Sequence, residues 1–358
     1  MKGTKPTNPV AGQPAATLAV WGPLLAAAAL LWPVLGMGFT GDDWHLLEIL
    51  DREAETQPPG PGCGLVFFTR AVSEHFSLYR PLVMTSLGVD LAWHGAEAAG
   101  FMVTTVLLHL ICGALYFGLL RRLVPEVGAW VTSVATLVFL ASPLQLEVAT
   151  WSSARSETLS FAFGIGALLC KLGRPERRLV PGILLLAALW SKESALVWLP
   201  AIAVVDLFGV KTDFARLRRR WWPLGLVVVG WFLLRVFVLG TWSGRYGHVD
   251  AGAVGLADHV GRFIHSLAMV LAPVSRVTVE LPALRWGLVA GFILAWLVVA
   301  FSLAGVRRQG RGLVVALGAL LVIVPLGLSV LINPINGALV GSRAAYTPLA
   351  GLLLFATL

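Results

Sequence analysis

The chain has 358 residues, of which 57% are hydrophobic and only 13% are charged, whereas a soluble domain is about one-quarter charged. Fourteen Trp and 38 Gly are typical of a membrane protein, because Trp anchors interfaces and Gly permits close helix packing. The net charge of +8 is explained by membrane topology, so we expect no nucleic-acid partner.

Apolar runs of about 20 residues, the length that an α-helix needs to cross hydrocarbon, recur along the chain. Backbone groups in lipid must be bonded internally, and the alternation of an outer-membrane barrel is absent, so these runs are expected to be helices. The sequence predicts an all-α integral membrane protein with a polytopic bundle of about ten spans, at residues 18–36, 101–120, 128–144, 156–171, 179–191, 194–209, 222–240, 285–306, 312–332 and 344–358.

The first apolar run resembles a signal peptide, but the sequence WPVLGMGF that ends it has no convincing small-x-small cleavage site. We therefore interpret it as an uncleaved anchor. The last run stops at FATL, so either the chain ends with its final span or the sequence is a fragment.

The distribution of Lys and Arg sets the predicted orientation. With Lys2 and Lys5 in the cytoplasm, the cytoplasmic segments hold 16 of the 27 basic residues but only four of the 19 acids. These segments contain Arg121-Arg122 and the clusters KLGRPERR, KTDFARLRRR and VRRQGR. We expect a bacterial inner membrane protein with a cytoplasmic N-terminus.

Two regions allow more than one topology. Between Arg178 and Lys211, both flanks are basic, so either two short spans break near WSKES or a re-entrant pair lies there. Between Arg262 and Arg285, another span would place VRRQGR outside, so we expect a helix at the outer surface that Pro273 ends.

We expect one membrane-embedded domain over residues 1–358, with a large extracytoplasmic loop at 38–100 and a second outer segment at 241–284. In the large loop, DDWHLLEIL and YRPLVMTSLGVDLAWHG have the spacing of amphipathic helices in the interface plane. The sequence QPPGPGCG between them is a Pro/Gly connection.

Charged and polar groups gather on the predicted outer side, which indicates a polar cavity roofed by the 38–100 loop. Charged groups near a membrane are functional candidates by default. The candidate functional residues are Asp42, Asp43, Tyr79, Arg80, His109, Glu147, Arg155, Lys192, Glu193, Arg343 and Tyr346.

Each candidate also has a structural interpretation. Asp42 and Asp43 could cap the helix that begins at Trp44, and Tyr79-Arg80 could be an interfacial anchor. His109 could be a hydrogen-bonded packing residue. Glu147 and Arg155 could form a structural ion pair, and Lys192-Glu193 could only mark a break between spans.

No phosphate-binding loop, dinucleotide fingerprint, zincin His pair or serine hydrolase elbow occurs in the sequence. The three cysteines show neither metal-ligand spacing nor an evident disulfide framework. An enzyme of this kind would take an activated substrate from the membrane.

The order of the short motifs resembles the GT-C superfamily of polyprenyl-phosphate-sugar-dependent glycosyltransferases, nearest to the protein O-mannosyltransferases that carry TPR repeats. The stretch at 142–159 is similar to the family pattern HP-x-x-x-E-x-x-x-W-x-x-x-R, with Ser142 at the His position, and the TPR region is absent. The other motifs are the pair Asp42-Asp43, YRPL at 79–82 followed by SLGVDLAWHG, LLHL around His109, WSKESALVWLP at 190–200 and SRAAYTPLAG at 342–351.

The resemblance implies a GT-C-like fold and inverting sugar transfer on the extracytoplasmic face. The donor would be a polyprenyl-phosphate sugar, and the acceptor a protein, lipid or glycan hydroxyl. By position, Asp42 would be the general base, with Asp43 as assistant or alternative. Arg80, Arg155, Lys192 and Arg343 could stabilise the departing phosphate, and Glu147 could orient Arg155 or bind a sugar hydroxyl.

No clear set of metal ligands or cofactor motif occurs in the sequence, although a divalent cation bridging Asp43 or Glu147 to phosphate stays open. Two other functions stay open as well. A transporter or lipid flippase also places polar residues in its spans, but needs them on both faces of the midplane. A non-catalytic scaffold would keep the spans and lose the site.

Overall fold

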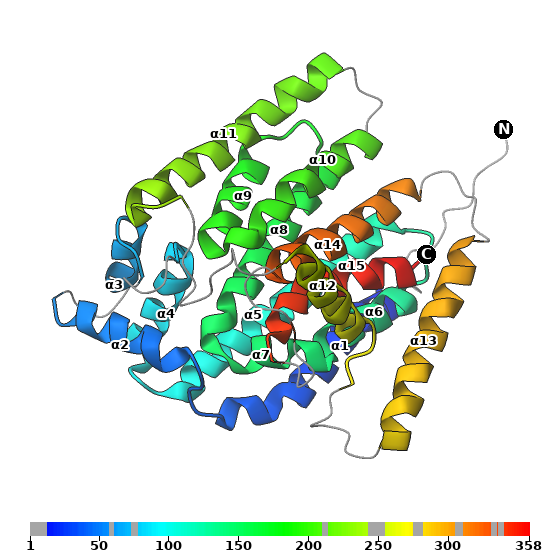
Figure 1. Ribbon diagram of the computed structural model, residues 1–358, viewed down its shortest axis with the longest axis horizontal. Coiled ribbons are helices and arrows are strands. Elements are labelled where there is room, and N and C mark those ends of the chain that lie inside the picture. The colour runs from blue at the N-terminus through cyan, green and yellow to red at the C-terminus, as the bar shows by residue number, and fades with distance from the viewer. Residues whose placement is uncertain are drawn as a thin grey trace, which may run out of the picture.

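The computed structural model is an all-helical protein in the part of the chain that it describes, with no strand there. The helices run side by side in a bundle, and shorter helices lie across one end of it (Figure 1). The described residues are 13–56, 61–72, 78–209, 214–242, 255–274, 282–304, 311–330, 335 and 340–358. The prediction of an all-α chain is confirmed for these residues.

The described helices follow the apolar and amphipathic runs of the sequence closely. They are α1 Gln13–Leu31, α2 Asp43–Ala54, α3 Pro61–Leu65, α4 Pro81–His94, α5 Ala98–Leu123, α6 Ala129–Ala141, α7 Leu146–Thr150, α8 Arg155–Gly173, α9 Leu179–Ser191, α10 Trp198–Gly209, α11 Phe214–Leu239, α12 Leu256–Leu271, α13 Pro282–Ala304, α14 Gly312–Val330 and α15 Tyr346–Ala356. Short 3-10 turns join several of them, such as Trp32–Gly36 after α1 and Glu193–Val197 before α10.

The helix boundaries have local causes. Helix α4 begins at Pro81, where the missing N–H is one of the donors that a first helical turn leaves unpaired anyway. It ends at His94, and the next residue, Gly95, has a φ of 58° that is readily available only to glycine. The amphipathic helix expected before Pro273 is α12, which ends at Leu271.

Four described helices are long and apolar enough to cross a membrane, and the bent pair α6 and Pro143–Thr150 would make a fifth. The long apolar helices favour an integral membrane protein. The expected number of spans, about ten, stays a prediction. The four spans are Leu18–Gly36, Ala98–Leu123, Arg218–Leu239 and Gly312–Ser329. Helix α9 and the segment Pro282–Leu294 are apolar but shorter.

Helix α8 lies at the centre of the bundle and packs against α5, α9 and α10. Its Gly164 faces the buried ring of Trp198, and a Cβ at this glycine would lie 2.1 Å from that ring. Helices α14 and α15 pack closely through Gly318 and Gly351, each of which would meet the backbone oxygen of the other within 3.0 Å if it carried a Cβ. These glycines allow close approach of the helix backbones.

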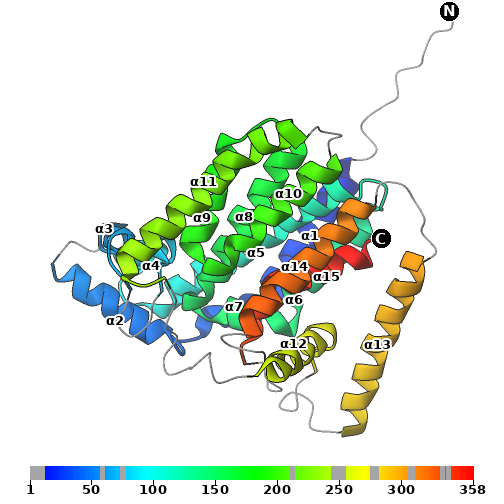
Figure 2. The ribbon, with the colours of Figure 1, turned by 45° about the horizontal axis from the view of Figure 1, so that its top comes forward.

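A second, smaller apolar cluster joins α2, α3 and α4 to the first half of α5. It includes the buried residues Leu50, Cys63, Leu87 and Phe101. The cluster attaches the predicted 38–100 loop to one end of the bundle, where α2, α3 and α4 lie (Figure 2).

Several sequence-based expectations fall outside the described residues. They include Lys2 and Lys5, residues 57–60 of the expected connection QPPGPGCG, and the basic residues Lys211, Arg307 and Arg308. For the rest of that connection, residues 61–64, the expectation of a Pro/Gly loop was wrong, because these residues form helix α3. In the predicted outer segment 241–284, residues 243–254 and 275–281 lie outside the described part as well.

Candidate active site

Asp42 and Asp43 follow a tight turn that brings the start of α2 against the segment after α7. Gly41 has a φ of 55°, and a Cβ at this position would lie 3.3 Å from the ring of Trp151. A larger residue at position 41 would therefore be strained in its backbone and crowded by the indole. After this turn, the Asp42 carboxylate is exposed and the Asp43 carboxylate is buried.

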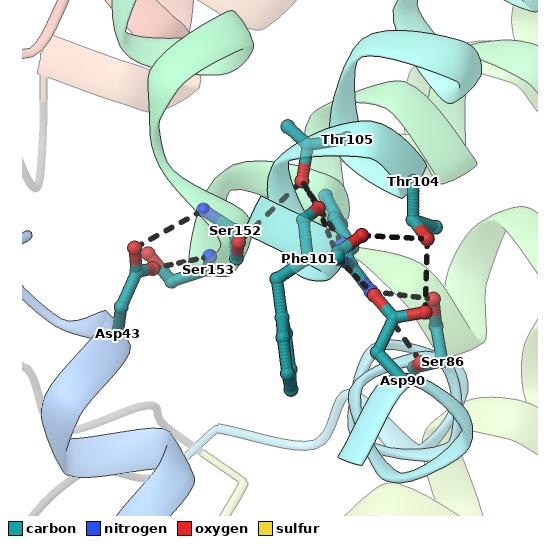
Figure 3. A network of polar contacts seen from close by, with 10 residues as sticks. Asp43, Ser86, Asp90, Phe101, Thr104, Thr105, Ser152 and Ser153 are labelled. Atoms are coloured by element: carbon teal, nitrogen blue, oxygen red, sulfur yellow. Dashed lines mark hydrogen bonds and ion pairs between the residues drawn. The ribbon is translucent and has the colours of Figure 1, made fainter. Parts of the chain in front are cut away.

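The side chain of Asp43 is buried and accepts hydrogen bonds from the backbone. Its carboxylate oxygens accept the N–H of Ser153 at 2.7 Å and the N–H of Ser152 at 3.3 Å (Figure 3). They also accept the N–H of Thr40 at 3.3 Å. Asp43 therefore fixes the segment after Trp151 to the start of α2. Its oxygens are occupied by donors of the protein itself.

Asp42, in contrast, is 64% exposed at its side chain and forms no capping bond, although it stands at the N-cap position of α2. Its Oδ2 lies 3.4 Å from Nη1 of Arg343, a residue from the start of the last helical segment. Of the two adjacent aspartates, Asp42 is the one whose carboxylate is accessible to a substrate.

Glu147 and Trp151 hold Arg343 beside Asp42. The Glu147 carboxylate accepts the backbone N–H of Gly341 at 2.9 Å and the backbone N–H of Arg343 at 3.0 Å. The guanidinium carbon of Arg343 lies 5.3 Å from the centroid of the Trp151 ring, a cation–π distance. The expectation that Glu147 orients Arg155 was wrong, since Glu147 binds the backbone of the 341–343 turn instead.

Two further candidate pairs lie at the break between α9 and α10. Arg80 donates to Oε2 of Glu193 from Nη2 at 2.9 Å and from Nε at 3.1 Å. Lys192, whose side chain is about one-fifth exposed, forms an ion pair with Glu157 near the start of α8. The break near WSKES is thus a charged junction between α4, α8 and α9.

The charges of this junction act on one another. Burial lowers the pKa of Lys192, and the positive charges of Arg80 and Arg343 lower it further. Burial alone would raise the pKa of Glu193, but the Arg80 guanidinium outweighs burial and holds this pKa below its ordinary value of 4.5. The site therefore combines the accessible Asp42 carboxylate with three neighbouring basic residues, Arg80, Lys192 and Arg343.

Arg155 lies beneath this surface and is fully buried. Its guanidinium forms an ion pair with Asp90 of α4 and donates to the Phe101 carbonyl at 2.8 Å, to Ser86 Oγ at 3.2 Å and to Thr105 Oγ1 at 3.3 Å. Figure 3 shows that Ser152 and Thr105 connect this network to Asp43. Arg155 is placed to support the site rather than to touch a phosphate.

His109, Tyr346 and Tyr79 are also buried. His109 Nδ1 lies 2.8 Å from the Tyr346 hydroxyl, and its Nε2 lies 3.0 Å from the Leu140 carbonyl. With Nε2 donating to the carbonyl, Nδ1 accepts from the tyrosine, so both groups are satisfied. The Tyr79 hydroxyl donates to the Phe68 carbonyl at 3.1 Å.

The structure thus divides the candidates into two sets. Close to one another at the end of the bundle are the partly exposed residues Asp42, Arg80, Lys192, Glu193 and Arg343. Buried or half-buried are the residues that hold other parts in place: Asp43, Tyr79, His109, Glu147, Arg155 and Tyr346.

Sequence reasoning missed Asp90, Glu157 and Arg235 as partners of the site. Asp90 and Glu157 each neutralise a candidate cation, and the charge of Arg235 acts on Glu193. Asp90 and Arg235 stand in apolar stretches of α4 and α11, and an ionisable group in such a stretch is a signal that a partner is near. That signal could have identified these two residues but not their partners, and Glu157, in the charged first turn of α8, gives no such signal.

No group of three or more His, Cys, Asp or Glu side chains within the described residues is arranged to hold a metal ion. The two carboxylates considered for a divalent cation, Asp43 and Glu147, both bind backbone N–H groups instead. These residues do not fit a metal centre, and no catalytic step is assigned to one.

Comparison with known proteins finds one distant relationship. No family model matches the chain, and no solved structure gives a significant match. The chain is 22% identical over 205 residues to Protein O-mannosyl-transferase F38B6.6 of Caenorhabditis elegans. The matched residues make up 56% of this chain and 29% of the relative, so the chain covers less than a third of that protein. The relationship favours a membrane protein similar to glycosyltransferases.

Proposed function

We propose that this protein is a GT-C-type membrane glycosyltransferase that moves a sugar from a polyprenyl-phosphate donor to an acceptor hydroxyl, with inversion at the sugar carbon. Asp42 is the general base. The contact between the accessible Asp42 carboxylate and Arg343 carries the proposal, because it places a proton acceptor beside a cation that can bind phosphate.

The chemistry requires one displacement. The acceptor oxygen forms a bond to the anomeric carbon while the bond from this carbon to the phosphate oxygen breaks. The acceptor proton passes to the Asp42 carboxylate, and the polyprenyl phosphate leaves with additional negative charge. Fixed cations beside a developing phosphate charge lower the barrier. Arg343 fills this role. Lys192 and Arg80 lie in the adjoining charged junction, where each is paired with a glutamate.

The remaining candidates act through these groups. Glu147 and Trp151 position Arg343, while Asp43 positions the segment that carries Trp151. The active site opens at the extracytoplasmic surface of a bacterial inner membrane, the donor tail lies in the lipid, and the acceptor is a protein, lipid or glycan. Mannose is the first sugar to test, since the distant relative is named an O-mannosyl-transferase.

The test uses the full chain in detergent micelles, without any ion gradient, supplied with polyprenyl-phosphate mannose and a membrane extract as acceptor. We expect acceptor-dependent release of polyprenyl phosphate, and a product with inverted anomeric configuration by NMR. A panel of polyprenyl-phosphate hexoses extends the test to other sugars. If none of these donors is consumed, the assignment as a glycosyltransferase is wrong.

A further inference from the structure

A cavity of about 380 Å³ lies at the end of the bundle opposite the candidate active site, between the last turns of α5 and α8. Its volume falls in the range of small-ligand pockets, which begins at about 300 Å³. The cavity is lined by Arg122, Leu169, Cys170, Gly173, Arg174 and Arg177. It belongs to neither the charged junction nor the network around Arg155.

The lining is strongly basic. It contains three arginines and no acidic residue. Within the part of the chain that the structure describes, no ion pair involves Arg174 or Arg177. Glu176 lies in the same turn but does not line the cavity. Guanidinium groups bind phosphate oxygens with two parallel N–H donors, so such a lining favours a phosphate group.

The position of the arginines is fixed by contacts between the helices. Arg122 donates from Nη1 to the Leu169 carbonyl at 2.6 Å, which ties α5 to the end of α8. Lys171 pairs with the buried Asp206 at 3.1 Å and donates to the Pro175 carbonyl at 3.0 Å, which holds the turn that carries Arg174 and Arg177. The cavity is therefore bordered by a turn with defined attachments.

The cavity and the candidate active site lie at opposite ends of helix α8, about the thickness of a bilayer's hydrocarbon core apart. Helix α8 has 19 residues, and at 1.5 Å per residue it is about 28 Å long, close to the thickness of a bilayer's hydrocarbon core, about 30 Å. Its first turn lies at the candidate site and its last turn at the cavity. The following helix, α9, begins with exposed apolar side chains, Leu179 and Ile183.

We propose that this cavity binds the phosphate of an acidic phospholipid headgroup, on the face of the membrane opposite the candidate active site. Basic pockets between transmembrane helices bind such headgroups. The exposed apolar start of α9 favours a lipid over a free phosphate ion, because it offers a surface for an acyl chain. The proposal does not depend on the glycosyltransferase assignment.

The test measures binding of dioctanoyl phosphatidylglycerol to the delipidated full chain in detergent, by native mass spectrometry and by the shift in thermal unfolding. Dioctanoyl phosphatidylcholine and inorganic phosphate are the comparison ligands. The variant R174Q/R177Q removes two exposed cations without touching the Arg122 bridge. The control R218Q/R219Q removes two exposed cations from α11 that do not line the cavity.

We expect R174Q/R177Q to weaken phosphatidylglycerol binding at least about tenfold, and the control to change it less than about twofold. The single variant Arg177→Glu, which places an acid in the lining, should also abolish binding. Equal losses in both double variants would mean a general charge effect and would overturn the proposal. Equal stabilisation by inorganic phosphate and by the lipid would overturn the lipid as the source of the phosphate.

Discussion

Asp42 and Arg343 are 301 residues apart in the sequence, yet Oδ2 of the first lies 3.4 Å from Nη1 of the second. The first residue precedes α2 and the second precedes α15. Their contact requires the start of α2 and the last helical segment to meet at one end of the bundle. The pair therefore places an exposed carboxylate beside a cation from a distant part of the chain.

Replacing Asp42 by Asn should remove sugar transfer and leave the protein folded. The amide has the shape of the carboxylate but cannot accept the acceptor proton, and loss of a general base costs about 10²- to 10⁴-fold in rate. The exposed Asp42 side chain forms no capping bond, so the free energy of unfolding should change little. The assay is acceptor-dependent release of polyprenyl phosphate from polyprenyl-phosphate mannose at saturating donor.

The control for that experiment is Asp51→Asn, which changes an exposed acid of the same helix α2. It should transfer sugar at the rate of the unmodified protein. Full activity of the Asp42→Asn variant would remove Asp42 as the base.

Replacing Asp43 by Asn should act mainly on stability. Asp43 accepts three backbone N–H groups with its two oxygens, and the amide nitrogen of Asn would face one of these donors instead. An unsatisfied buried donor costs about 1–3 kcal/mol. The thermal unfolding midpoint should fall, and the rate of transfer should fall less than in Asp42→Asn. An unchanged midpoint would show that these hydrogen bonds contribute nothing.

The Arg155 and Asp90 pair should show strong coupling. Each single change, Arg155→Met or Asp90→Leu, leaves one buried charge without its partner, a loss that costs about 3–5 kcal/mol. The double variant removes both charges and should be more stable than either single variant. Equilibrium unfolding in mixed micelles gives the free energy of unfolding of the unmodified protein, the two single variants and the double variant, which together form a double-mutant cycle. Additive effects of the two changes would contradict a stabilising pair.

Acid should weaken the junction between Arg80 and Glu193. The pKa of Glu193 is lowered from 4.5 in the folded protein, so the unfolded chain binds this proton first as pH falls. The stabilisation is complete above about pH 4.5 and is lost as pH falls through the folded pKa. Glu193→Gln should flatten the unfolding profile in this window. The exposed Glu48→Gln, which breaks the surface pair with Arg52, should leave it unchanged.

The helices themselves were predictable because their apolar runs and breakers are local features. The expected segment 179–191 is α9 to the residue, and the two helices expected in the 38–100 loop are α2 and α4. The expectation that α4 is an amphipathic surface helix was wrong, because Val83, Met84 and Leu87 bury it in the second apolar cluster. The number of spans was not predictable in the same way, because α9 and α10 are shorter than a full crossing. Length and composition identify the longest helices only.

The partners of the charged side chains could mostly not be predicted from the sequence. Glu147 and Arg155 stand eight positions apart in a motif, which favours a local pair, but Arg155 binds Asp90, 65 residues earlier. Glu147 binds the turn at 341–343, nearly 200 residues later. Only the packing of α4, α8 and the last segment decides between such partners, and packing depends on contacts far apart in the chain.

The central helix α8 carries Arg155, Glu157 and Lys171, and each charge is neutralised by a different element. Asp90 precedes α8 in the chain, but Lys192 and Asp206 follow it. During synthesis, Glu157 and Lys171 can therefore form their ion pairs only after the ribosome has added Lys192 and Asp206. Helix α8 should consequently leave the insertion machinery together with α9 and α10, and truncation before Asp206 should leave it exposed to quality-control proteases.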